Sequence, residues 1–148
     1  MEELASRALK LQMIVTGGSD QATSQTLQKI KRRYPSFRLQ IPGFVERMDL
    51  YLYAADLVCG KAGANSVAEA MYAKRPFLIT TGYYNVEATA EFLERYGVGW
   101  YKREVKEQAD LIEKAMADPN LLGEISFENL PIRFGAREFA QEILNLLP

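Results

Sequence analysis

The chain has 148 residues, of which 48% are hydrophobic and 25% are charged, so it carries enough apolar material for one sizeable core. Its 18 basic and 19 acidic residues give a net charge of −1, which indicates neither a nucleic-acid nor a membrane-surface partner. Histidine is absent, and this excludes Ser-His catalytic pairs and imidazole metal ligands within the chain.

The chain reads as a single domain over residues 1–148, because no linker, repeat or low-complexity tract interrupts it. The start "MEELASRALKLQMIV" lacks the order of a signal peptide, and no run approaches the ~20 apolar residues of a membrane span. These features predict a cytoplasmic protein. The only cysteine, Cys59, lies in an apolar run and is expected to be a small buried core residue.

Short apolar runs typical of strands alternate with segments of helical period. The runs cover residues 11–16, 37–41, 56–60, 76–80 and 97–101, and the clearest helical spacing lies in residues 22–33, 109–116 and 139–147. This alternation predicts right-handed crossovers and an α/β fold, a Rossmann-like three-layer α/β/α domain with a parallel sheet. Such sheets bind ligands at the carboxyl ends of their strands, so the loops there are the candidate site.

The loop after the first run, "VTGGSD", places Gly17 and Gly18 directly behind a strand. Paired glycines allow a tight turn and close approach of the backbone to a ligand, or they simply turn the chain into the next helix. The G-x-G-x-x-G and Walker patterns are both absent.

The loop after the second run, "GFVER", carries apolar Phe44 and Val45 where a strand should already have ended. These side chains could flank a flat base. Alternatively, Phe44 packs beneath the loop as part of the core.

The stretch "GKAGANSVAEA" follows the third run, and its small residues leave room for a ligand to approach the backbone of the next helix. Asn65 or Ser66 is expected to cap that helix. A helix N-terminus presents unpaired N–H groups and a partial positive charge, so Gly63, Ala64, Asn65 and Ser66 could hold a diphosphate.

Glu69 lies one turn further along the predicted helix, where a carboxylate could accept hydrogen bonds from a pair of sugar hydroxyls. However, "SVAE" also matches a capping box, in which Glu69 would bond the backbone N–H of Ser66. The spacing leaves both roles open. In the loop after the fourth run, Asn85 and Glu87 could bind a polyol or form an ordinary polar first turn of a helix.

The order of these motifs resembles the C-terminal, donor-binding half of GT-B glycosyltransferases. The stretch "AADLVCGKAGANSVAEA" is the most specific part, and the resemblance runs from about Leu11 to Leu147. It is strongest to the family 28 group, which contains the peptidoglycan N-acetylglucosaminyltransferase, the diacylglycerol glucosyltransferases and the galactolipid synthases.

The resemblance implies a role for each loop. Gly17, Gly18 and Ser19 would lie near the diphosphate or the acceptor, Phe44 and Val45 would hold uracil, and Glu69 would bind the ribose hydroxyls. Residues 63–66 would bind the diphosphate. The family's Q-E-x-x-N-like run that reads the sugar is replaced here by "NVEAT", residues 85–89, so the identity of the sugar stays open.

The resemblance also implies a UDP-sugar donor, an inverting transfer of a hexose or N-acetylhexosamine to a lipid-linked or other acceptor, and no cofactor or metal. The acceptor site and the catalytic base would belong to an N-terminal half, supplied in cis or in trans, so no catalytic residue is assigned here and the isolated chain is expected to be inactive. Any membrane contact, at the inner face of a membrane, would be made through that half. The alternatives are a non-catalytic nucleotide-sugar-binding module or partner subunit, and half of a UDP-sugar 2-epimerase.

Overall fold

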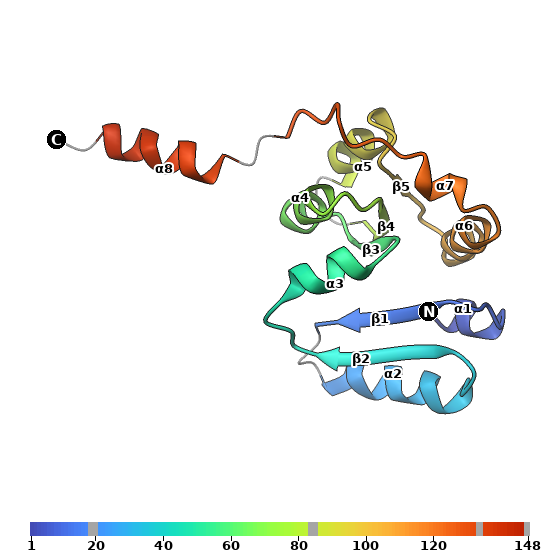
Figure 1. Cartoon of the computed structure of the whole chain (residues 1–148). Coiled ribbons are helices and arrows are strands. Elements are labelled where there is room, and N and C mark those ends of the chain that lie inside the picture. The colour runs from blue at the N-terminus through green and yellow to red at the C-terminus, as the bar shows by residue number, and fades with distance from the viewer. Residues whose placement is uncertain (18–20, 83–85, 133–134, 147–148) are drawn as a thin grey trace.

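The computed structural model describes residues 1–17, 21–82, 86–132 and 135–146. Helices and strands alternate as far as residue 117, and two more helices follow (Figure 1). The strands are β1 (Gln12–Thr16), β2 (Arg38–Gly43), β3 (Val58–Lys61), β4 (Phe77–Thr81) and β5 (Gly99–Tyr101). The helices are α1 (Glu2–Ser6), α2 (Gln21–Arg33), α3 (Met48–Ala54), α4 (Ala64–Tyr72), α5 (Val86–Arg95), α6 (Val105–Ala117), α7 (Asn120–Gly123) and α8 (Ala136–Asn145). Each predicted strand is present, with bounds that differ by no more than two residues.

All strand pairs are parallel, as expected for this fold class, but they form two sheets. One sheet pairs β1 with β2, and the other has the order β3-β4-β5. Between β1 and β3 lies a cavity of about 1120 Å³, lined by both strands and by side chains of α3, α6 and α7. Helices therefore flank the space that separates the two sheets.

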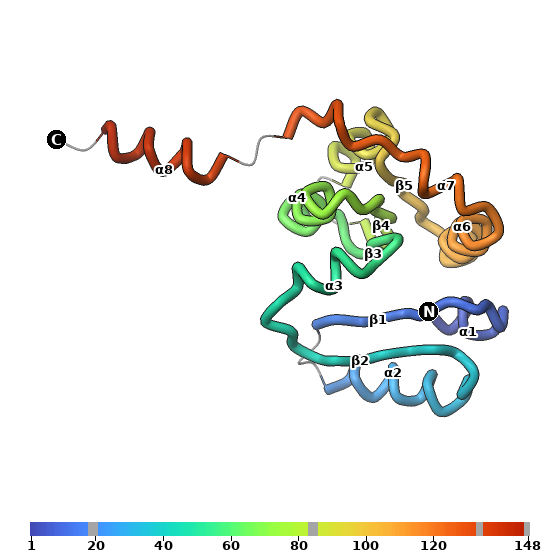
Figure 2. Tube along the Cα trace, in the orientation of Figure 1, coloured from blue at the N-terminus to red at the C-terminus, as the bar shows by residue number. Residues whose placement is uncertain are grey.

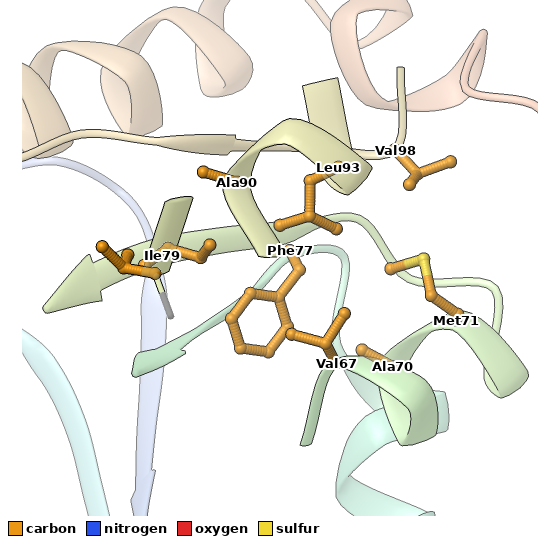
Figure 3. Close-up of a cluster of buried hydrophobic side chains, with 9 residues drawn as sticks. Val67, Ala70, Met71, Phe77, Ile79, Ala90, Leu93 and Val98 are labelled. Carbon is orange, nitrogen blue, oxygen red and sulfur yellow. The ribbon is translucent and has the colours of Figure 1, made fainter. Parts of the chain in front are cut away.

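The centre of the larger core is β4, whose Phe77, Leu78 and Ile79 are at most 1% exposed. Figure 3 shows the side chains that pack around Phe77 and Ile79, which come from α4, α5 and the segment before β5: Val67, Ala70, Met71, Ala90, Leu93 and Val98. Burying one such side chain contributes about 1.5–3 kcal/mol. This packing holds α4 and α5 against β4 and so places the N-terminus of each helix.

A second core joins α1, α2 and α6 to the β1–β2 sheet through Leu4, Ala5, Ile30, Phe37, Leu39 and Ala109. On the surface beside it, the Arg7 guanidinium pairs with the carboxylates of Glu3 at 2.8 Å and of Asp110 and Glu113 at 2.7 Å. These hydrogen bonds raise the pKa of Arg7, and Arg7 in turn lowers the pKa of Asp110. Arg7 thereby ties α1 to α6.

Gly99 allows β5 to lie close to β4. It pairs with Phe77 in the parallel register, and a Cβ on Gly99 would overlap the Phe77 carbonyl oxygen. Gly123, at the end of α7, has open space around the position of its Cβ.

Gly99→Ala should therefore destabilise the domain by about 1–3 kcal/mol, because the added methyl group must push β5 away from β4. Gly123→Ala is the matched control and should leave the free energy of unfolding unchanged within about 1 kcal/mol. Urea denaturation of both variants measures the difference. Equal stability of the two would contradict the close packing of β5.

Cys59 differs from its prediction, because it is exposed and not buried in the core. It lines the cavity between the sheets and a smaller one of about 290 Å³ beside it. These surroundings disfavour the thiolate, and desolvation raises the pKa of the Cys59 thiol to about 11.

Alkylation of Cys59 by iodoacetamide should consequently be slow at neutral pH, since only the thiolate reacts. The raised pKa predicts that the rate climbs about tenfold per pH unit from pH 7 to 9.5 without levelling. The same chain unfolded in urea is the control, and near pH 8 it should react roughly 100-fold faster because its thiol has an ordinary pKa. A native rate that levels off near pH 9 would show an unshifted thiol.

Candidate functional site

The turns after β1 and β2 lie side by side at the carboxyl ends of these strands. The Gly17 N–H donates to the Gly43 carbonyl oxygen at 3.0 Å, and the two residues have φ of +83° and +76°, a region that favours glycine. Gly17 is exposed, as a contact with a ligand requires. Gly18 and Ser19, predicted beside it, lie outside the described residues.

Phe44 follows Gly43 and is 82% exposed. The alternative that Phe44 packs beneath its loop is therefore wrong. Val45 is half-buried. The end of β2 thus presents a free aromatic ring, a surface on which a flat ring can stack.

The start of α4 differs in one respect from the prediction. Gly63 is the N-cap, in extended conformation, and no side chain caps the helix, so the predicted caps Asn65 and Ser66 lie inside its first turn. No described residue accepts a hydrogen bond from the N–H groups of Ala64, Asn65 or Ser66. A nine-residue helix therefore begins with free donors and the positive end of its dipole.

The position of the N-cap also excludes one of the two roles considered for Glu69. A capping box needs serine at the N-cap and glutamate at the third helical position, whereas here Ser66 is the third residue of α4 and Glu69 the sixth. The capping box is therefore absent. Glu69 is exposed, and its carboxylate has no hydrogen bond or ion pair to any described residue.

Lys61, the last residue of β3, also lies at the candidate site, although the sequence motifs did not identify it. Its Cε lies 3.9 Å from the position that a Cβ on Gly63 would take, and the Gly63 N–H donates to the Lys61 carbonyl oxygen at 2.7 Å. An exposed ammonium group thus lies beside the start of α4. The sequence signal that could have identified it is a lysine at the end of a strand, two residues before the N-cap of the next helix.

Gln108 of α6 hydrogen-bonds the backbone at the ends of β4 and β5. Its Nε2 donates to the carbonyl oxygens of Thr80 and Lys102, both at 2.9 Å, and the Thr80 hydroxyl donates to the Gly60 carbonyl oxygen at 3.3 Å. These bonds link the carboxyl ends of β3, β4 and β5.

Of the polar pair in the fourth loop, Glu87 is exposed in the first turn of α5, as expected, and Asn85 lies outside the described residues. The structure thus places the described candidate residues in the loops that follow the strands and in the first two turns of the helices after those loops. None of them lines either of the two cavities between the sheets, so the candidate site is an open surface. Within the described ranges, no three acidic or cysteine side chains gather as a metal site would require, and no helix could span a membrane.

Comparison with known proteins adds a family match. The profile of the family described as "Glycosyltransferase family 28 C-terminal domain" matches residues 2–142. No curated protein sequence is significantly similar to the chain.

Two solved structures are similar in fold. HepE of Anabaena, in complex with UDP-glucose, superposes with a TM-score of 0.71 at 17% identity over 97% of this chain and 43% of its own. MurG of Acinetobacter baumannii superposes with a TM-score of 0.69 at 19% identity over 97% of this chain and 44% of its own. These likenesses confirm the Rossmann-like fold, and the chain spans less than half the length of either structure.

Ser66→Ala should leave the free energy of unfolding unchanged within about 0.5 kcal/mol, because Ser66 caps nothing. Loss of a true N-cap would instead cost about 0.5–2 kcal/mol. Thermal denaturation of the variant beside the wild-type chain separates these outcomes. A loss of about 1–2 kcal/mol in the free energy of unfolding would show that Ser66 does cap the helix.

Proposed function

Because the profile match spans nearly all of it, the chain belongs to the glycosyltransferase family 28 C-terminal domains, and we propose that it binds a UDP-sugar at the carboxyl ends of its strands. In this proposal it is the donor half of an inverting glycosyltransferase. The observation that carries the proposal is the open start of α4, where three free N–H groups and Lys61 surround one exposed position.

A diphosphate suits this position for two physical reasons. Free N–H groups at a helix start point along the axis toward an incoming anion, and the helix dipole adds about half a positive charge there. Lys61 supplies a full charge nearby.

The other parts of the donor are assigned to the neighbouring loops. The uracil ring stacks on the exposed face of Phe44, with Val45 beside it, and the Glu69 carboxylate accepts hydrogen bonds from the ribose hydroxyls. Gly17 lets its turn approach the diphosphate or the acceptor, and Glu87 binds sugar hydroxyls. Support for this arrangement comes from the exposure of Phe44 and from the unpaired state of Glu69 among the described residues.

The proposed reaction is a displacement at the anomeric carbon. An acceptor hydroxyl oxygen forms the new bond to this carbon, the bond from the carbon to the diphosphate oxygen breaks, and UDP leaves with the electron pair. The hydroxyl proton passes to a base on the acceptor-binding half. The start of α4 and Lys61 stabilise the negative charge that develops on the departing diphosphate, which is electrostatic catalysis by groups already in place.

Glu69→Gln tests the assignment of the ribose site. Replacing the carboxylate with an amide removes charge-assisted hydrogen bonds of ~1.5–3 kcal/mol, so the affinity for UDP should fall roughly 10- to 150-fold. The melting temperature should stay unchanged, because Glu69 has no described partner.

Isothermal titration calorimetry of the chain with UDP, and with ADP for selectivity, measures the effect. Glu94→Gln on the exposed surface of α5 is the matched control and should bind UDP as the wild type does. If Glu69→Gln binds UDP with unchanged affinity, Glu69 does not contact the ribose. Equal binding of UDP and ADP would contradict the uracil contact.

A further inference from the structure

The pairing of β3 with β4 becomes irregular at the point where β3 leads into the candidate site. Gly60 pairs with Ile79, and Lys61 pairs with Thr81. Thr80 is thus an extra residue on β4 that lies opposite no residue of β3. An extra residue of this kind forms a β-bulge, which bends its strand and re-aims the side chains beside it. The direction of Lys61 therefore depends on how Thr80 is held.

Two side-chain hydrogen bonds hold Thr80 in place. The Thr80 hydroxyl donates to the Gly60 carbonyl oxygen at 3.3 Å, which adds a bond across the bulge where the ladder is interrupted. On the side toward β5, Nε2 of Gln108 donates to the Thr80 carbonyl oxygen at 2.9 Å. Thr80 and Gln108 are both half-buried, so water competes less for these groups than it would at the surface.

Gln108 also joins β4 to β5 beyond the end of their ladder. The last pair of that ladder is Ile79 with Tyr101, and the next residues along the two strands are Thr80 and Lys102. The amide of Gln108 has two N–H donors, and Nε2 bonds the carbonyl oxygen of Lys102 at 2.9 Å as well as that of Thr80. A single side chain thus continues the link between the strands where their backbones stop pairing.

Helix α6, which carries Gln108, is anchored by contacts outside the site. Figure 2 shows α6 beside the end of β5 on one side and beside α1 on the other. Ala109, next to Gln108, is 2% exposed in the core of the β1–β2 unit. Arg7 of α1 pairs with Asp110 and Glu113 of the same helix. Gln108 is therefore a fixed point to which the bulge is tied.

A path of direct contacts leads from the bulge to the start of α4. Gly60, whose carbonyl oxygen accepts the bond from Thr80, is followed by Lys61, and the Gly63 N–H donates to the Lys61 carbonyl oxygen at 2.7 Å. Gly63 is the N-cap of α4. Any change in the backbone at Gly60 is thus passed to Lys61 and to the first turn of α4.

We propose that Gln108 and Thr80 are positioning residues for the donor diphosphate, which set the direction of Lys61 and of the first N–H groups of α4 without touching the ligand. The inference rests on the proposed function, because that function assigns the diphosphate to the start of α4. These donors stabilise an anion only when they converge on it, since a hydrogen bond weakens steeply as its angle departs from linear.

The nucleoside part of the donor should not depend on these bonds. Glu69, assigned to the ribose, lies in the second turn of α4, where Val67, Ala70 and Met71 pack on the core around β4. Phe44, assigned to uracil, follows β2 in the other sheet. The positioning role therefore predicts an effect on the binding of UDP that the binding of uridine does not share.

The experiment compares three variants of the whole chain. Thr80→Val removes the hydroxyl at nearly constant shape, and Thr80→Ser keeps the hydroxyl and is the matched control. Gln108→Met removes both amide donors at similar volume. The affinity for UDP should fall roughly 3- to 10-fold in Thr80→Val and in Gln108→Met, because a misaligned donor loses about one hydrogen bond to the diphosphate.

Titration calorimetry with UDP, and nuclear magnetic resonance titration with uridine, measure the two affinities. The affinity for uridine should stay the same in all three variants, and Thr80→Ser should bind UDP as the wild type does. In the chain without ligand, the amide resonances of Ala64, Asn65 and Ser66 should shift in Thr80→Val and keep their positions in Thr80→Ser. Thr80→Val tests the path by itself if Gln108→Met fails to fold.

Two results would overturn the inference. Equal losses of affinity for UDP and uridine in Thr80→Val would mean that the bonds support the whole domain. Unchanged affinity for UDP in Thr80→Val and Gln108→Met, with lower melting temperatures, would mean that the bonds serve stability alone.

The wild-type chain separates this inference from the proposed function. If it binds UDP no better than uridine, the diphosphate site of the proposed function is refuted. The amide resonances then decide the inference: shifts at Ala64, Asn65 and Ser66 in Thr80→Val would retain the path from Thr80 to the start of α4, and unshifted resonances would overturn it.

Discussion

Burial of β4 is the constraint on which the candidate site depends. A parallel strand covered on both faces must be apolar throughout, and Phe77, Leu78 and Ile79 are almost completely removed from solvent. Because α4 and α5 pack on these residues, their N-termini are held beside the carboxyl ends of the strands. The free N–H groups of α4 thus owe their position to side chains on the other face of that helix.

Helix α6 relates the two sheets to each other. Its Ala109 lies in the core of the β1–β2 unit, while the neighbouring Gln108 bonds the backbone at the ends of β4 and β5. The pairing of Arg7 with Asp110 and Glu113 fixes α1 to the same helix. One helix therefore contacts both units, although β1 and β3 share no backbone pairing.

Exposed apolar and hydrogen-bonding groups remain on the surface of this domain. Three features leave favourable contacts unmade: the aromatic ring of Phe44, the uncapped start of α4 and the exposed apolar side chains of α8. Each of them lowers the stability of the isolated domain. The two hydrophobic cores supply the stability that allows these groups to remain open.

The sequence by itself determined the five strands, their alternation with helices, the loops proposed to carry the site and the fold class, because these follow from the local periodicity of apolar residues and from glycines at strand ends. It left Glu69 between two roles, since a capping box and a ribose ligand share the same spacing, and only the folded backbone showed that Gly63 is the N-cap. The exposure of Phe44 and Cys59, and the separation of β1 from β3, were likewise beyond it. These properties depend on which distant surfaces meet, and no local pattern specifies contacts between segments that lie far apart in the chain.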